Sequence, residues 1–277
     1  MIIFAKVVDQ SVVMHVLVIN SPLFSEPISN YSGHSLPLLG LGFIISSLKK
    51  SGFLVDFIDA FSQNLSIGRL IEIIKDYETD VILMNIFSAN LSIIYSVIEQ
   101  IDESIKIILG GGTKQVYTEI LEWKFKQNIY VIIGEGELVI PSILKNEYDD
   151  IYIQKNNVLV VNIDPFSKFF PHDISGLEVD HSIFLNEPFL HHQGFWECYI
   201  SISRGCIYNC AFCGSARSIN AHIPIRTRSV GSVHKELDSL LKHNSCIQTI
   251  RVLDDLFLKG ELSALHAIEI FKKYPLT

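Results

Sequence analysis

Residues 81–112, VILMNIFSANLSIIYSVIEQIDESIKIILGGG, contain one complete unit of the pattern that decides the fold. The apolar runs at 81–84 and 105–109 are short and continuously hydrophobic, as in strands buried on both faces. Between them, residues 93–101 place apolar side chains at helical spacing. A strand, a helix and a second strand in this order predict a parallel pair of strands joined by a crossover helix.

The same alternation extends from this unit in both directions. Further strands are predicted at 16–19, 55–58 and 131–133, and further helices at 38–50, 67–77 and 116–125. Alternation of this length predicts a parallel sheet covered by helices on both faces. The expected fold class is therefore α/β, with a Rossmann-like sheet in the first half.

Residues 146–194 separate this alternation from a second one. A hairpin is predicted at 151–163, because the Asn-Asn pair at 156–157 favours a turn, and the remainder is expected to be irregular. Beyond it, residues 198–203 and 247–253 predict strands, each followed by a helix.

The second half is expected to begin a parallel (β/α) barrel. Ser229 is expected to cap its first helix, and the second helix places Leu262, Leu265 and Ile268 on one side. Active residues of such barrels lie at the carboxyl ends of the strands. A barrel of two units would leave apolar helix faces and strand edges uncovered.

Glycines and acids follow the predicted strands of the first half. Gly110, Gly111 and Gly112 end one strand, and the segment Gly-Glu-Gly-Glu at 134–137 ends another. Ligands of parallel sheets bind beyond the carboxyl ends of the strands, where glycine lets the backbone approach them closely. Taken alone, the three glycines are explained more simply by a tight turn, and Glu135 and Glu137 could instead be acids at a helix N-terminus.

Three cysteines lie within the eight residues 206–213, as Cys206, Cys210 and Cys213. One loop of this spacing can bring three thiolates to one metal centre, and three ligands leave one iron of a four-iron cluster open. Zinc, with His222 as a fourth ligand, is an alternative.

Disulfide bonds are not favoured, because the chain has five cysteines and no secretory signal. Cys198 and Cys246, which lie on apolar segments, are expected in the core.

The Cys-x3-Cys-x2-Cys spacing, with Phe212 before the third cysteine, resembles the signature of the radical S-adenosylmethionine (radical-SAM) superfamily. The resemblance implies that the three cysteines hold a [4Fe-4S] cluster whose open iron binds S-adenosylmethionine. It also implies a deoxyadenosyl radical, and an electron donor such as flavodoxin or ferredoxin.

The resemblance suggests further residues of the cofactor site. Asp254 and Asp255 follow the second barrel strand, and a carboxylate suits the ammonium group of S-adenosylmethionine. A solvated loop or a helix cap is the competing interpretation of this pair. Arg226 and Arg228 resemble the Arg-x-Arg that follows the cysteine loop in this superfamily, and surface arginines are the alternative.

The first half resembles the cobalamin-binding domain that precedes the barrel in many radical-SAM proteins. The resemblance rests on an ordered set of motifs: residues 37–42, Asp59, residues 110–113 and residues 134–137. The Asp-x-His-x-x-Gly motif, which supplies a histidine to cobalt, is absent. The resemblance implies a cobalamin-binding-like Rossmann domain at 14–145, a connector at 146–194 and a partial radical-SAM barrel at 195–277.

The expected function is radical chemistry on a small-molecule substrate, with methyl transfer if cobalamin binds. A non-catalytic cluster or cobalamin module, or a truncated fragment that needs a second chain to complete its barrel, is the alternative. A more distant resemblance is to enzymes that add methylthio groups to transfer RNA.

Composition narrows the class of protein. The net charge of −8 over 277 residues argues against a nucleic-acid partner. The longest apolar run, at 36–48, is too short to span a bilayer, and no signal peptide is recognisable, so a cytoplasmic location is expected.

Overall fold

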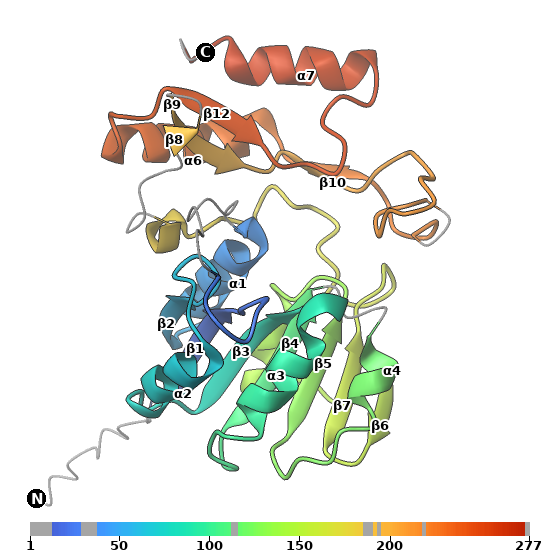
Figure 1. The fold of residues 1–277 in the computed structure, drawn as a ribbon. Helices are drawn as coiled ribbons and strands as arrows, with labels where there is room; N and C mark the ends of the chain where they lie inside the picture. The colour runs from blue at the N-terminus through green and yellow to red at the C-terminus, as the bar shows by residue number, and fades with distance from the viewer. Residues whose placement is uncertain are drawn as a thin grey trace, which may run out of the picture.

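The computed structural model describes residues 13–28, 38–111, 116–184, 191–192, 195–217 and 220–274. Figure 1 shows a larger half built on one broad sheet, and a smaller half that lies beyond one end of its strands. No helix in these ranges is long and apolar enough to cross a membrane.

The larger half contains a seven-stranded sheet in the order β2-β1-β3-β4-β5-β7-β6. Its strands are parallel except β6, which runs antiparallel to β7. Their bounds are β1 His15–Asn20, β2 Leu54–Asp59, β3 Val81–Ile86, β4 Lys106–Gly111, β5 Ile129–Ile133, β6 Ile153–Lys155 and β7 Val158–Asn162. The six residues of β3 are all buried, as their continuous apolar run predicts.

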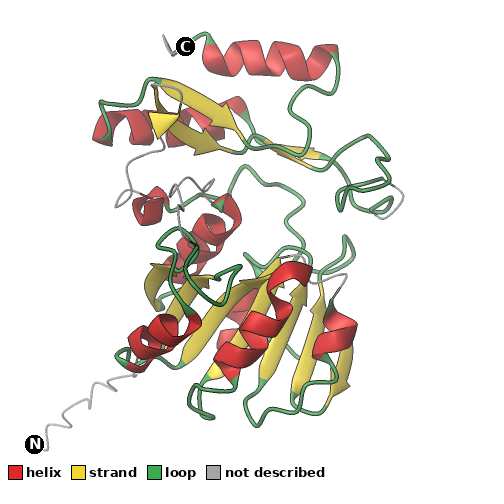
Figure 2. Cartoon of the chain, viewed as in Figure 1, coloured by secondary structure: helices red, strands yellow, loops and turns green. Residues whose placement is uncertain are grey.

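Helices cover both faces of this sheet (Figure 2). On one face α2 (Ile67–Lys75), α3 (Leu91–Ile98) and α4 (Tyr117–Ile120) pack on alternate strand residues such as Leu17 and Met84. On the other face α1 (Leu39–Lys50) and α5 (Val139–Leu144) pack on residues such as Val18 and Leu83. The α/β fold class expected from the sequence is confirmed.

One helix is shorter than its sequence predicts. The apolar pattern at 116–125 predicts a helix of ten residues, but α4 ends at Ile120. Trp123 and Phe125 leave the helix and pack around the Tyr95 ring, with ring centroids 5.4 and 4.7 Å away. Aromatic packing therefore overrides the helical periodicity.

The predicted hairpin at 151–163 is present as β6 and β7, and Asn156 in its turn has φ of 53°. It extends the main sheet beyond residue 145. The domain boundaries at 145 and 194 remain predictions.

The smaller half has the expected strand–helix–strand–helix order. A three-stranded sheet, β12-β9-β8, contains β8 (His191–His192), β9 (Phe195–Ile200) and β12 (Thr249–Val252), and β9 and β12 are parallel. A separate antiparallel pair contains β10 (Ser203–Arg204) and β11 (Arg226–Thr227). The Ser229 side chain caps α6 (Val230–His243) by accepting a hydrogen bond from the Ser232 amide at 3.2 Å, as predicted.

The last helix, α7 (Glu261–Phe271), buries Ala267 and Ile270. The apolar side recognised in the sequence faces solvent instead, with Leu262, Leu265 and Ile268 exposed by 84%, 54% and 61%. This matches the expectation that two barrel units leave an apolar helix face uncovered.

The two remaining cysteines differ from each other. Cys198 is fully buried on β9, and burial raises the pKa of its thiol to about 12. The prediction that Cys246 lies in the core is wrong, because it sits in the exposed turn between α6 and β12, where Ile247 turns inward instead.

Candidate functional site

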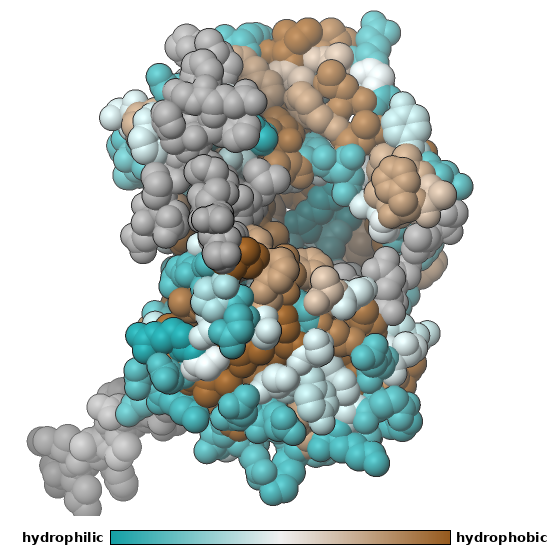
Figure 3. Space-filling model, in the orientation of Figure 1, coloured by the Kyte–Doolittle hydropathy of each residue, from teal (hydrophilic) through white to brown (hydrophobic). Residues whose placement is uncertain are grey.

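A cavity of about 390 Å³ lies beyond the carboxyl ends of β3, β4 and β5. The start of α1 and two segments of the smaller half complete its wall, and Figure 3 shows the molecule hollowed between its two halves. Its lining is mainly apolar and includes Leu39, Phe43, Met84, Ile108, Ile132 and Leu253. Parallel sheets bind ligands beyond this end of their strands.

Glycines give this cavity its open shape. Gly110 and Gly111 line it, and a Cβ atom at Gly110 would meet no atom within 4 Å, so a side chain there would project into free space. Gly111 has φ of +99°, a conformation that favours glycine. The ligand interpretation and the tight-turn interpretation of these glycines both stay predictions. Gly112 lies outside the described residues.

Two acids at the end of β5 face the smaller half. Glu135 accepts a hydrogen bond from Arg204 at 2.5 Å and pairs with Arg226, and Glu137 accepts one from Arg204 at 2.7 Å. Burial opposes the charge of Arg204, but Glu137 and Glu135 outweigh this effect and raise the pKa of its guanidinium. The first turn of α5 contains no acid, and the side chains of both glutamates pair with arginines of the smaller half.

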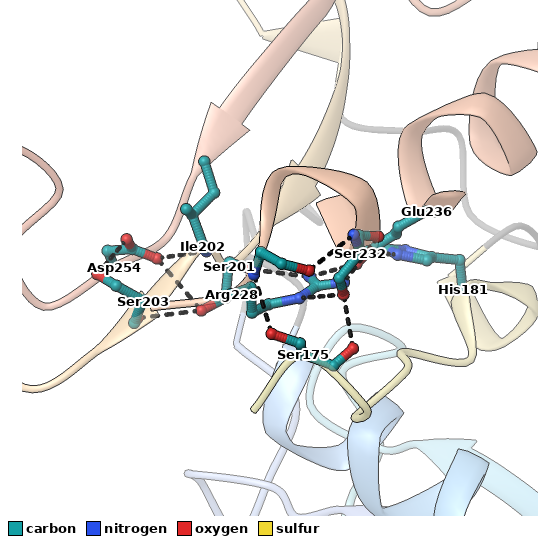
Figure 4. A network of polar contacts seen from close by, with 10 residues as sticks. Ser175, His181, Ser201, Ile202, Ser203, Arg228, Ser232, Glu236 and Asp254 are labelled. Atoms are coloured by element: carbon teal, nitrogen blue, oxygen red, sulfur yellow. Dashed lines mark hydrogen bonds and ion pairs between the residues drawn. The ribbon is translucent and has the colours of Figure 1, made fainter. Parts of the chain in front are cut away.

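Neither arginine of the Arg-x-Arg pattern is a surface residue. Arg226 is 7% exposed and Arg228 is 2% exposed. Arg228 pairs with Glu236, which also accepts a hydrogen bond from His181 at 2.7 Å (Figure 4). Arg226 therefore pairs with Glu135 of the segment after β5, and Arg228 pairs with Glu236 of α6, near the base of the cysteine loop.

A second cavity, of about 260 Å³, lies beside that loop. Cys206, Arg226 and Asp255 line it, and Glu135 and Arg204 line both cavities. The loop itself is open to solvent, with Cys206 and Cys213 half-buried, Cys210 exposed and Phe212 93% exposed. In the part of the chain that the structure describes, no three His, Cys, Asp or Glu side chains converge as a metal site.

The two aspartates after β12 have separate contacts. Asp254 accepts hydrogen bonds from the Ile202 amide at 2.8 Å and the Ser203 hydroxyl at 2.7 Å. Asp255 accepts one from the Gly205 amide at 3.1 Å and one from the Ser215 hydroxyl at 2.8 Å. Asp254 thus fixes the strand that leads into the cysteine loop, and Asp255 lies inside the loop's own cavity.

Comparison with known proteins agrees with this geometry. Residues 27–144 match the model of the B12 binding domain family. These residues are therefore similar to a B12-binding domain. The matched residues include β2, β3, β4 and β5, and the glycine-lined cavity lies beyond the carboxyl ends of β3, β4 and β5.

Solved structures share the fold of the larger half and the smaller half together. The cobalamin-dependent S-adenosylmethionine radical enzyme OxsB, with aqua-cobalamin and S-adenosylmethionine bound, matches 93% of this chain with a TM-score of 0.63 at 21% identity. The radical S-adenosylmethionine methyltransferase TsrM from Kitasatospora setae, with cobalamin and a [4Fe-4S] cluster bound, matches 94% with a TM-score of 0.61 at 16% identity. The chain therefore shares the fold of these enzymes, and the resemblance expected from the sequence is confirmed.

Two curated proteins are similar in sequence. An uncharacterized methyltransferase of Pyrococcus horikoshii is 25% identical over 91% of this chain, and a putative methylthiotransferase of Methanocaldococcus jannaschii is 23% identical over 69%. The chain spans 56% and 39% of their respective lengths, and 36% and 52% of the OxsB and TsrM chains.

Sequence reasoning missed the residues that join the larger half to the cysteine loop. The sequence analysis gives Arg204 no role, although it stands two residues before Cys206. Its guanidinium lies over the Phe43 ring of α1, 4.8 Å from the centroid. The sequence did contain a signal for this contact. An arginine stands beside the cysteine motif and two acids stand beside the glycines, and these opposite charges can pair.

Proposed function

We propose that this chain is the cofactor-binding part of a cobalamin-dependent radical-SAM enzyme that acts on a small molecule. Cys206, Cys210 and Cys213 would hold a [4Fe-4S] cluster, with S-adenosylmethionine at its open iron. Cobalamin would occupy the glycine-lined cavity. The observation that carries this proposal is the shared wall of Glu135 and Arg204 between the two cavities.

The residues of the first cavity fit a large, flat ligand. Gly40 and Gly110 leave open space where a side chain would otherwise stand, and the surrounding wall is apolar. Apolar walls with a few polar groups are the usual lining of cofactor sites. His15 is the described histidine of the larger half, and its ring hydrogen-bonds to Asp56 of the same sheet at 2.7 Å. This half would therefore hold cobalamin without a histidine ligand from that position.

The donor set of the cysteine loop fits a cluster. Three free thiols lie on one loop, and two of them are half-buried while the third is exposed. Soft thiolate ligands suit iron–sulfur clusters, and three of them leave one position open. Asp255 would receive the ammonium group of S-adenosylmethionine, because its carboxylate lies in the same cavity as Cys206.

When bound, the cluster would supply an electron from a donor such as flavodoxin or ferredoxin, and cobalamin would supply a methyl group. The protein's own contribution would be positional. Arg204 and Asp254 would fix the base of the cysteine loop, and the apolar wall of the first cavity would exclude water.

Anaerobic reconstitution tests this proposal. The chain is expected to bind about four irons and four sulfides, to bind hydroxocobalamin in a spectral titration, and to form deoxyadenosine from S-adenosylmethionine after reduction. The variant in which Cys206, Cys210 and Cys213 are all alanine should lose the iron and sulfide. The matched control Cys246→Ala, at an exposed cysteine outside the loop, should keep them.

Other results would identify a different function. Zinc without iron or sulfide would contradict the cluster. A loaded cluster without deoxyadenosine would favour a non-catalytic module, or a part that needs a further chain. Similarity to a putative methylthiotransferase makes methylthio transfer the second candidate, and sulfur incorporation into transfer RNA would support it over methyl transfer.

A further inference from the structure

Two arginines face each other at the base of the cysteine loop. Arg204 on β10 and Arg226 on β11 are direct partners in the antiparallel register, and the loop runs between these two strands. Like charges directly opposite each other on neighbouring strands repel and destabilise the pair. The short ribbon that closes the cysteine loop therefore needs an anion from elsewhere.

Glu135 of the larger half supplies this anion. Its Oε2 atom accepts hydrogen bonds from Arg204 at 2.5 Å and from Arg226 at 3.0 Å, and its Oε1 atom pairs with Arg226. Glu137 accepts a hydrogen bond from Arg204, and its charge balances the second positive charge of the arginine pair. The four side chains together carry no net charge, and their exposed fractions range from 5% to 20%.

Aromatic rings fix the planes of both guanidinium groups. Arg204 lies over Phe43 of α1, and Arg226 lies 4.3 Å from the centroid of Phe170. Arg226 also donates a hydrogen bond to the Pro171 carbonyl at 2.8 Å. Each arginine is therefore held by a residue outside the smaller half.

The cluster is not arranged for maximum stability. The Oε2 atom of Glu137 and the Nε atom of Arg226 are buried without a hydrogen-bond partner in the described structure. Desolvating four charges with incomplete pairing is unfavourable compared with an apolar contact, so position rather than stability accounts for this arrangement.

We propose that Glu135 is a positioning residue that sets the cysteine loop against the glycine-lined cavity by neutralising the Arg204–Arg226 pair. The proposal extends the proposed function, because it names what keeps the two cofactor sites in register. Its mechanical part concerns the protein alone and can be tested without either cofactor.

Hydrogen exchange of the cofactor-free chain gives that test. In Glu135→Gln, the backbone amides of 203–217 and 220–227 should exchange about tenfold faster or more, while β1 to β5 stay within about twofold. The matched control Glu122→Gln removes one exposed ion pair, to Lys155, and should change neither region.

A rescue variant separates neutralisation of charge from simple packing. If Glu135 acts by neutralising the arginine pair, then Glu135→Gln combined with Arg226→Gln should return exchange of the loop to within about threefold of the original protein. Unchanged exchange in Glu135→Gln, or no rescue in the double variant, would overturn the proposal. If Glu135→Gln does not fold, Arg226→Gln, which leaves both glutamates paired with Arg204, should fold and show less than half of the expected increase in loop exchange.

A spectroscopic measurement on the protein with both cofactors bound gives a second test of the positional role. With both cofactors bound and reduced to paramagnetic states, Glu135→Gln should weaken the magnetic coupling between the two centres at unchanged iron and cobalamin content. Equal coupling in both proteins would contradict the positional role. Failure of the original protein to load would instead contradict the proposed function, and the exchange experiment would still decide the role of Glu135.

Discussion

Arg228 shows how much one side chain can organise. Its guanidinium donates to the Ser201 carbonyl at 2.9 Å and the Ser232 hydroxyl at 3.0 Å, and it pairs with Glu236 (Figure 4). Burial opposes the charge of Glu236, but the hydrogen bond from His181 and the charge of Arg228 outweigh it, so the pKa of Glu236 lies below its usual value. The end of β9, the helix α6 and the connector therefore meet at the Arg228–Glu236 ion pair.

Replacing Arg228 should therefore be severely destabilising. Arg228→Met leaves Glu236 buried without its main cation, and the free energy of unfolding should fall by about 3–5 kcal/mol. Urea unfolding measures this loss. Arg69→Met, which removes an exposed pair with Glu72, should cost no more than about 1 kcal/mol. Equal losses in the two variants would contradict the role assigned to Arg228.

At the scale of elements, the carboxyl ends of the strands set the shape of the site. Gly134 follows β5 with φ of +98°, and a Cβ atom there would lie 2.5 Å from the Ile163 carbonyl oxygen at the end of β7. The Ile163 amide donates to the Ile133 carbonyl at 2.8 Å, so the two strand ends cannot easily separate. This close approach aims the segment at 134–137 toward the smaller half.

Gly134→Ala should disrupt this junction. Both the strained φ and the contact with the carbonyl oxygen oppose a side chain, so the variant should lose about 1–3 kcal/mol or more of stability. Gly231→Ala is the matched control in α6, where a Cβ atom meets nothing within 4 Å and alanine should stabilise by up to about 1 kcal/mol. Thermal unfolding of both variants measures the difference, and a neutral Gly134→Ala would refute the strain argument.

At the scale of the whole molecule, charged residues of the connector tie the two halves together. Glu178 pairs with Lys50 of α1 and with Lys235 of α6, and Asp180 pairs with Lys49. The hydrogen bonds from Lys235 and then Lys50 lower the pKa of Glu178 to about 2. These bridges join α1 of the larger half to the first helix of the smaller half.

The contribution of Glu178 should depend on pH with a definite sign. A carboxylate whose pKa is lowered by folding stabilises the protein fully above its unfolded pKa, and this stabilisation is lost as the pH falls through the folded value. The stability difference between the original protein and Glu178→Gln should be constant above about pH 5, and should shrink between pH 4.5 and about 2. Denaturant titrations across this range measure it. A difference that grows on acidification would contradict the assigned ion pairs.

The sequence predicted the elements that depend on local pattern. The strands β1 and β3 were recognisable because both of their faces are buried, and the capped start of α6 because Ser229 precedes it. The sequence identified the apolar side of α7 but not its direction, because periodicity does not say what a helix packs against. The end of α4 was missed because the aromatic cluster around Tyr95 forms only in three dimensions.

For the site, the glycine and cysteine motifs were recognisable because each is contiguous in the chain. The contacts between them were not, because Arg204 and Arg226 meet Glu135 across 69 and 91 residues. Asp254 and Asp255 are grouped together in the sequence, yet they contact different groups, because Asp254 accepts from the Ile202 amide and Asp255 from the Ser215 hydroxyl.

By itself the sequence determined the strand–helix order, the glycines at the sheet edge and the spacing of the three thiols, since these depend on residues close together in the chain. Only the tertiary structure decided that the two motifs share a wall, and that the acids after β5 neutralise two opposed arginines. The physical reason is that burial creates the need for charge neutralisation, and burial is a property of the folded chain rather than of any segment.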